Sequence, residues 1–135
     1  MSPSTAATPL QTPHYRVDET RLLANMQRIA RLRELSGARV LLALKCFATW
    51  SVFPLMRQYM DGTTSSSLHE LKLGRQKFGG ETHAYSVAWA THEMDEALAN
   101  ADKVIFNSRA QLERFGAQAQ AAGVPMGLRV NPGVS

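Results

Sequence analysis

Apolar residues recur along the chain with two alternating spacings. Over residues 18–36 they lie three and four positions apart, which predicts an amphipathic helix that Asp18 caps and Gly37 ends. The apolar run from Val40 to Leu44 follows directly. A run of that length predicts a strand buried on both faces, as in a parallel sheet.

The same alternation continues to the end of the chain. We expect five strands, at residues 38–46, 63–66, 82–88, 103–107 and 126–130. The helices between them are expected at 51–60, 67–78, 91–101 and 108–122. Two of these helices open with a capping-box pattern, Ser67 followed by Glu70 and Ser108 followed by Gln111. Repeated strand–helix units predict a parallel sheet, either open or closed as a barrel.

One further feature favours the barrel, and the length of the chain indicates that the barrel is truncated. Residues 46–49, after the first full strand, lack the glycine-rich fingerprint of a doubly wound dinucleotide-binding sheet. A (β/α) barrel typically needs about 250 residues, and this chain has 135. We therefore predict an α/β fold that is the N-terminal part of a TIM-type barrel, cut off after about five strands. It occupies residues 14–135, after a disordered tail at residues 1–13 that is rich in Ser, Thr, Ala and Pro.

Composition excludes several classes of function. The net charge is +4, but the basic residues are scattered, which favours a solvated helix face over a nucleic-acid surface. No apolar stretch approaches the roughly 20 residues that span a bilayer, and the N-terminus has no signal-peptide pattern. The single cysteine, Cys46, fits a reducing, cytoplasmic compartment and is expected to be a small packed residue. The four histidines show no metal-ligand spacing, so no metal site is expected.

Lys45 is the strongest candidate for chemistry. It follows five apolar residues, at the end of a strand where parallel α/β proteins place their active sites. A lysine desolvated there should have a lowered pKa and a nucleophilic amine. The alternative is a strand-end lysine whose ammonium reaches water. The run alone does not decide between the two.

Several motifs resemble one enzyme family. The chain is similar to the pyridoxal-phosphate (PLP) decarboxylases built on the alanine-racemase-type barrel, and in particular to carboxynorspermidine (carboxyspermidine) decarboxylases. The motifs that carry the resemblance are Thr-Pro-His-Tyr at 12–15, Leu-Ala-Leu-Lys-Cys-Phe at 42–47, Asp-Gly-Thr-Thr-Ser-Ser-Ser-Leu-His-Glu at 61–70, and Arg-Val-Asn-Pro-Gly at 129–133. Residues 81–86 and 106–108 fit the same family.

The resemblance implies roles for four residues. Lys45 matches the lysine that forms a Schiff base with PLP, Arg129 an arginine lining the cofactor site, and Ser66 and Glu70 residues beside the cofactor. Glu70 has an alternative role, which is to close the capping box with Ser67.

Arg129 has an alternative role as well, as a strand-end charge paired with a carboxylate. Strand alternation favours the site, because Arg129 shares its face with Gly127 and Asn131 while Leu128 and Val130 take the other. Two nearby residues are also weighed. His83 is expected to be a satisfied barrel residue, and Asn107 either faces the site or serves a turn or helix cap.

The resemblance also implies an activity. It is the PLP-dependent decarboxylation of carboxynorspermidine or carboxyspermidine to norspermidine or spermidine, in polyamine biosynthesis. The family works as a homodimer whose active site takes residues from both subunits. Its glycine-rich phosphate loop, its acidic partner for the pyridine nitrogen and its β domain lie beyond Ser135. We therefore expect the chain alone to be inactive and poorly folded.

Three alternatives stay open. The first is another barrel decarboxylase, acting on diaminopimelate, ornithine or arginine, since the half that shapes the substrate pocket lies outside the chain. The second is a single-domain, non-catalytic PLP-binding barrel. The third is an inactive α/β fragment.

Overall fold

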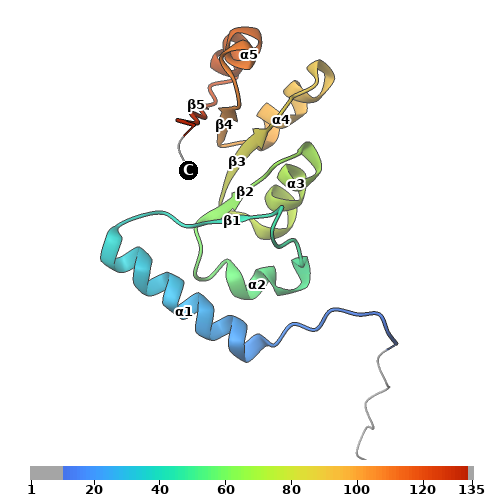
Figure 1. Ribbon diagram of the computed structural model, residues 1–135, viewed down its shortest axis with the longest axis vertical. Coiled ribbons are helices and arrows are strands. Elements are labelled where there is room, and N and C mark those ends of the chain that lie inside the picture. Colours follow the sequence, from blue (N-terminus) through green and yellow to red (C-terminus); the bar gives the residue numbers. More distant parts are fainter. Residues whose placement is uncertain (1–10, 134–135) are drawn as a thin grey trace, which may run out of the picture.

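The fold is a twisted sheet of five parallel strands in the order β1-β2-β3-β4-β5, which is also their order along the chain (Figure 1). The computed structural model describes residues 11–133. Residues 1–10 of the expected tail lie outside the described residues, and residues 11–13 form neither helix nor strand. The strands are β1 Leu41–Ala43, β2 Gly62–Thr64, β3 Glu81–Ser86, β4 Lys103–Phe106 and β5 Met126–Leu128. The predicted α/β class and parallel pairing are confirmed.

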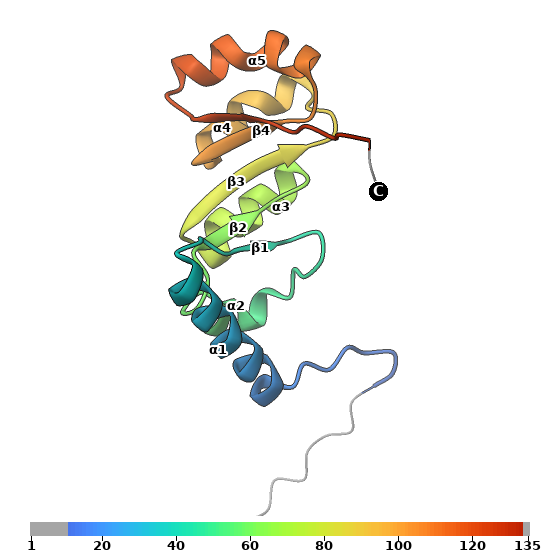
Figure 2. The ribbon, with the colours of Figure 1, turned by 60° about the vertical axis from the view of Figure 1, so that its left-hand side comes forward.

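A helical segment precedes each strand. They are α1 Glu19–Ser36, α2 Phe53–Met56 after a 3₁₀ turn at Trp50–Val52, α3 Leu68–Leu73 continued by a π turn at Gly74–Phe78, α4 Met94–Asn100 after a 3₁₀ turn at Thr91–Glu93, and α5 Arg109–Ala121. In Figures 1 and 2, α3, α4 and α5 follow one another along the same face of the sheet. This is the βα repeat that the sequence predicts.

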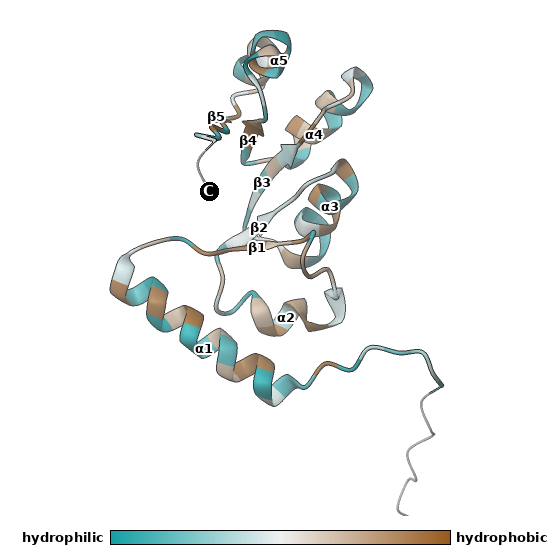
Figure 3. Ribbon diagram, viewed as in Figure 1, coloured by the Kyte–Doolittle hydropathy of each residue, from teal (hydrophilic) through white to brown (hydrophobic). Residues whose placement is uncertain are grey.

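The first helix forms for the predicted reasons. The Asp18 side chain accepts a hydrogen bond from the N–H of Arg21 at 3.1 Å, which satisfies one of the free donors in the first turn. At the other end, Gly37 takes a left-handed conformation with φ of 67° and donates its N–H to Arg33 O at 2.8 Å. Hydrophobic and hydrophilic segments alternate along α1 (Figure 3), and its apolar stripe is buried at Met26.

Two apolar clusters hold the helices on the sheet. One lies under α3, α4 and α5 and includes the buried Phe106, Val104 and Phe115. The other joins α1, α2 and β1 around Phe53, which meets Phe78 edge to face at 5.2 Å between ring centroids. The opposite face of the sheet carries the half-buried Glu81, His83 and Tyr85 of β3, and this is the face that a closed barrel turns inward.

Several element bounds differ from the sequence-based expectation. The strand expected at 38–46 is paired only over Leu41–Ala43, after which the chain turns over residues 44–46. Cys46 is exposed in this turn, so the expectation that it packs in the core is wrong. The helix expected at 51–60 is split, because its first turn is 3₁₀ and α2 has four residues. The last strand is paired over three residues only.

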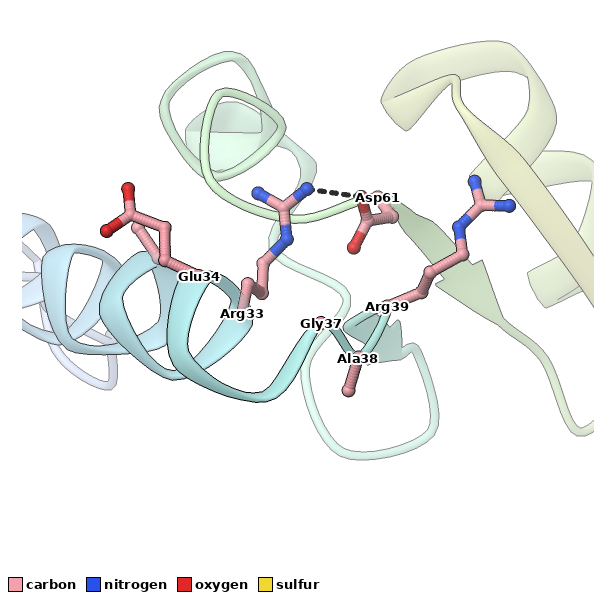
Figure 4. Close-up of a pocket in the computed structure, with 7 residues that line it drawn as sticks. Arg33, Glu34, Gly37, Ala38, Arg39 and Asp61 are labelled. Carbon is pink, nitrogen blue, oxygen red and sulfur yellow. Dashed lines mark hydrogen bonds and ion pairs between the residues drawn. The ribbon is translucent and has the colours of Figure 1, made fainter.

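Carboxylates bind the loops at the amino ends of the strands. Asp61, just before β2, forms an ion pair with Arg33 of α1 and accepts the N–H of Val40 at 2.7 Å (Figure 4). Burial alone would raise the pKa of Asp61, but the hydrogen bond from Val40 and the Arg33 guanidinium lower it below its usual value. Glu81 lies 2.6 Å from Nε2 of His83 and 2.5 Å from Arg39, and the hydrogen bond to His83 is the main reason that the pKa of Glu81 is lowered.

These lowered pKa values predict acid sensitivity. A carboxyl whose folded-state pKa lies below its ordinary value of about 4 stabilises the fold fully above that value and loses its contribution as the pH falls through the folded-state pKa. We expect the free energy of unfolding to fall below about pH 4, and part of this fall to disappear in Asp61→Asn. Urea denaturation at several pH values measures it. The control is Glu34→Gln, which changes an exposed carboxylate in the same region. If the free energy of unfolding fell as steeply with acid in Asp61→Asn as in the unsubstituted protein, the contribution ascribed to Asp61 would be contradicted.

Candidate functional site

The carboxyl edge of the sheet contains a hollow to which every strand contributes. Its volume is about 590 Å³. Its lining residues lie near or just after the carboxyl ends of the five strands and are Lys45, Thr64, Ser66, Tyr85, Val87, Ile105 and Arg129. The carboxyl ends of parallel strands meet at one edge, so residues that are 84 positions apart along the chain, such as Lys45 and Arg129, share the site. Three of the four predicted site residues are thus brought together.

Strand register decides which side chains reach this hollow. Ala43 pairs with Thr64, Thr64 with His83, and Tyr85 with Ile105, so these residues share one face of the sheet. Their sequence neighbours point the other way and are buried, among them Leu42, Thr63, Ala84 and Val104.

The expected alternation at the last strand is confirmed in part. Gly127 pairs with Ile105, and Arg129 lines the hollow. Asn131 does not reach it. Its side chain instead accepts the N–H of Gly133 at 3.1 Å and closes a turn.

Lys45 lies in the turn after β1 and its side chain is exposed. The expectation that this lysine is desolvated is therefore wrong for the described chain, because β1 is an edge strand of the sheet and the hollow beside it is open. A smaller hollow of about 100 Å³ lies against Lys45, Ser66 and Tyr85. The amine is accessible to a ligand that enters the site.

Arg129 is held by two neutral side chains. Its Nη1 donates to Oδ1 of Asn107 at 3.0 Å and lies 3.3 Å from the Tyr85 hydroxyl, which itself donates to the same Asn107 oxygen at 2.8 Å. We call Tyr85, Asn107 and Arg129 the edge triad. Among the described residues no carboxylate forms an ion pair with Arg129, so the alternative of a carboxylate-paired arginine is not supported.

Ser66 is fixed by Glu70. Glu70 Oε2 accepts from the Ser66 N–H at 2.7 Å and from its hydroxyl at 2.9 Å. The Ser67 hydroxyl accepts the Glu70 N–H at 3.2 Å, so half of the expected capping box is present. The second bond of the capping box, from the Ser67 N–H to the Glu70 carboxylate, was expected but is absent, because that carboxylate binds Ser66 instead. Glu70 lies behind the hollow and orients a residue that lines it.

Two other residues weighed from the sequence also find partners. His83 bonds to Glu81 on the inward face, as expected of a satisfied barrel residue. Asn107 does not itself line the hollow, but its side chain bonds to Arg129, which does. Its N–H donates to Gln111 Oε1 at 3.2 Å, and the N-cap of α5 is Ser108 rather than Asn107. Tyr85 was not singled out from the sequence. The sequence pattern that could have identified Tyr85 is its position two residues after His83 in the same strand. This spacing places Tyr85 on the same face of the sheet as His83 and nearer to the carboxyl edge.

A second hollow, of about 320 Å³, lies at the other end of the sheet between α1 and the loops before β1 and β2 (Figure 4). It is lined by Arg33, Arg39 and Asp61, but Arg33 pairs with Asp61 and Arg39 with Glu81. Both arginines of this hollow are thus paired within the protein, which indicates a structural role for them.

The described residues contain no group of three or more His, Cys, Asp or Glu side chains placed to hold a metal ion. Over the same residues, no helix is both long enough and apolar enough to cross a membrane.

Fold and site together define the class. A run of parallel βα units with an accessible lysine after β1 and an arginine after β5, both at the carboxyl edge, is part of a β/α-barrel with its site at the usual edge. No family model matches the chain.

Individual relatives are more specific. The chain is 66% identical over 126 residues, or 93% of its length, to a carboxynorspermidine/carboxyspermidine decarboxylase of Herminiimonas arsenicoxydans. It is 37% identical over 90% of its length to the Campylobacter jejuni decarboxylase of the same name. A carboxyaminopropylagmatine decarboxylase of Synechocystis is 32% identical over 91% of the chain.

A solved structure gives the same result. The crystal structure of carboxynorspermidine decarboxylase from Campylobacter jejuni, in complex with norspermidine, matches 82% of the chain and 30% of its own with a TM-score of 0.79 and 37% identity. The chain spans 31–34% of the length of these curated relatives. In sequence and fold the chain is thus similar to a segment of the carboxynorspermidine/carboxyspermidine decarboxylases, about a third of their length.

The contacts of Glu70 predict a local effect of its removal. Glu70→Ala leaves the Ser66 N–H and hydroxyl without their acceptor, so we expect the free energy of unfolding to fall by about 1–3 kcal/mol. Hydrogen exchange at the Ser66 amide should accelerate as well. The control Glu113→Ala removes only an exposed pair with Arg109 and should cost about 0.5 kcal/mol or less. Equal losses in the two variants would show that the bonds to Ser66 are not special.

Proposed function

We propose that the protein to which this chain belongs decarboxylates carboxynorspermidine or carboxyspermidine, giving norspermidine or spermidine in polyamine biosynthesis, with PLP as its cofactor. The observation that carries this proposal is the position of Lys45, at the carboxyl end of β1 and open to the hollow that Ser66, Tyr85 and Arg129 also line. The identity of 66% to a relative of that name supports it.

The residues present fit PLP by their chemistry. A primary amine such as Lys45 Nζ condenses with an aldehyde, and a guanidinium such as that of Arg129 binds anionic oxygens. Both lie on one hollow of about 590 Å³ with hydroxyl groups between them. When bound, PLP would supply an electron sink for the electron pair left as carbon dioxide departs.

The chain's own groups would divide the remaining work. Lys45 Nζ would hold the cofactor until the substrate's amine replaces it. The Ser66 hydroxyl donates its hydrogen to Glu70, so its lone pairs are left to accept a hydrogen bond from a ligand. Arg129, whose geometry Asn107 and Tyr85 fix, would place positive charge opposite an anionic group.

The names of the relatives narrow the substrate class. The Campylobacter structure holds norspermidine, and the Synechocystis relative is a carboxyaminopropylagmatine decarboxylase. The substrates named for these relatives have in common a carboxylated aminopropyl group on a cationic amine. A carboxyaminopropylagmatine substrate is therefore the second candidate, which the lower identity of 32% ranks below the first. Diaminopimelate, ornithine and arginine have no such support among these relatives. A homodimer in the cytoplasm stays a prediction.

The cofactor lysine can be tested in a full-length chimera, in which the matched segment of the Herminiimonas enzyme is replaced by this chain. Titration with PLP, borohydride reduction and peptide mapping should place the label on Lys45. Lys45→Ala should lose both the label and turnover by several orders of magnitude, because no other amine among residues 11–133 lines the hollow. The control is Lys77→Ala, which changes an exposed lysine on the π turn after α3. A label that persists at another lysine in Lys45→Ala would contradict the proposal that Lys45 is the cofactor lysine.

The same chimera tests the substrate. We expect kcat/KM to be highest for carboxynorspermidine or carboxyspermidine, lower for carboxyaminopropylagmatine, and negligible for diaminopimelate, ornithine and arginine. A preference for diaminopimelate would overturn the proposed substrate class and leave the cofactor lysine standing.

A further inference from the structure

Gln111 ties together the carboxyl ends of two neighbouring strands. It is the third residue of α5, whose N-cap Ser108 accepts the Gln111 N–H at 3.3 Å. Its side-chain Oε1 accepts the N–H of Asn107, just after β4, at 3.2 Å. Its Nε2 donates to the carbonyl of Val87, just after β3, at 2.6 Å. One planar amide thus supplies an acceptor to one strand end and a donor to the other.

These contacts exceed those of a helix cap. In a capping box the third side chain returns to the N–H of the N-cap residue. Here it reaches one residue further back, to Asn107, and also crosses to a carbonyl 24 residues earlier in the chain. Capping alone does not need the second contact.

The tied segments carry the edge triad. Asn107 presents Oδ1 to both the Tyr85 hydroxyl and Arg129 Nη1. Tyr85 lies two residues before the carbonyl that Gln111 holds. Gln111 itself does not line the hollow. Its effect on the site would therefore pass through the backbone at Asn107 and Val87 to the guanidinium of Arg129.

A parallel arrangement occurs at β2. Glu70, the third residue of α3, accepts the N–H of Ser66, the residue before the N-cap Ser67. In both places a helix side chain holds the backbone of a residue just after a strand, and that residue lines the hollow, as Ser66 does, or bonds to Arg129, as Asn107 does. The difference is that an amide at position 111 can also donate to Val87, which a carboxylate cannot.

We propose that Gln111 is a positioning residue that sets the geometry of the edge triad, and through it of Arg129, by joining the ends of β3 and β4. The role of that triad rests on the proposed function. The amide is required because the site needs one acceptor and one donor from the same side chain. Gln111→Glu keeps the acceptor and places a carboxylate oxygen against the Val87 carbonyl, whereas Gln111→Ala removes both bonds.

The full-length chimera carrying each variant tests this. We expect Gln111→Ala to lower kcat/KM by about 10- to 100-fold, the range known for residues that orient a ligand-bearing side chain at metal sites. Gln111→Glu should retain protected exchange at the Asn107 amide and still lose activity. Gln120→Ala changes an exposed glutamine on the same helix and should leave both readouts unchanged.

A double-mutant cycle separates positioning from general stability. If Gln111 acts through Asn107, Gln111→Ala should have little further effect on kcat/KM in an Asn107→Ala background. Full additivity, or unchanged kcat/KM in both Gln111 variants, would overturn the proposal. Hydrogen exchange at the Asn107 amide does not depend on turnover. If the unmodified chimera binds no PLP, the proposed function fails. Faster exchange at the Asn107 amide in Gln111→Ala would then still show that Gln111 holds the end of β4.

Discussion

The site depends on the in-register parallel pairing of the five strands. Pairing of Thr64 with His83 and of Tyr85 with Ile105 puts alternate side chains on opposite faces of the sheet. If β3 were shifted by one residue, Tyr85 would lie on the face that the helices cover. Ala84, which is fully buried in the structure, would then lie on the open face. The apolar cluster beneath α3, α4 and α5 therefore also determines which side chains lie on the opposite face of the sheet. The register that buries Val104 and Phe106 in this cluster places the polar residues on the open face.

The first turns of two helices also hold residues of the site in place. The strands β1, β2 and β5 are each three residues long and end before Lys45, Ser66 and Arg129. The residues beyond the strand ends need other partners for their backbone groups. Glu70 supplies them at Ser66 and Gln111 at Asn107, so the first turns of α3 and α5 hold the residues that line the hollow or touch its arginine. The helices thus do more than cover the sheet.

Much of this architecture could be predicted from sequence patterns. Apolar periodicity together with turn and capping residues predicted the order of the helices and strands, and the residue types at Asp18, Gly37, Ser67 and Ser108 located helix ends correctly. Lys45, Ser66 and Arg129, which the position after the apolar run and the family resemblance singled out, all line one hollow. The rest depended on contacts between distant segments.

Three examples show why those contacts were missed. The bond from Gln111 to Val87 joins residues 24 positions apart, and no local pattern encodes it. The exposure of Lys45 depends on what lies next to β1 in space and not on the apolar run before it. Gly62 reads as a turn residue after Asp61, yet the packing requires glycine there, since a Cβ would lie 1.9 Å from the Glu81 carbonyl oxygen.

The two ends of the sheet use charge differently. At the amino ends two arginines have carboxylate partners, Arg33 with Asp61 and Arg39 with Glu81. At the carboxyl edge, Lys45 and Arg129 have no carboxylate in ion-pair contact among residues 11–133. Paired charges hold loops together and produce little external field, whereas two unneutralised cations beside one hollow attract anions. Phosphate and carboxylate groups are anions of this kind, so the charge distribution supports the proposal of a ligand site at the carboxyl edge.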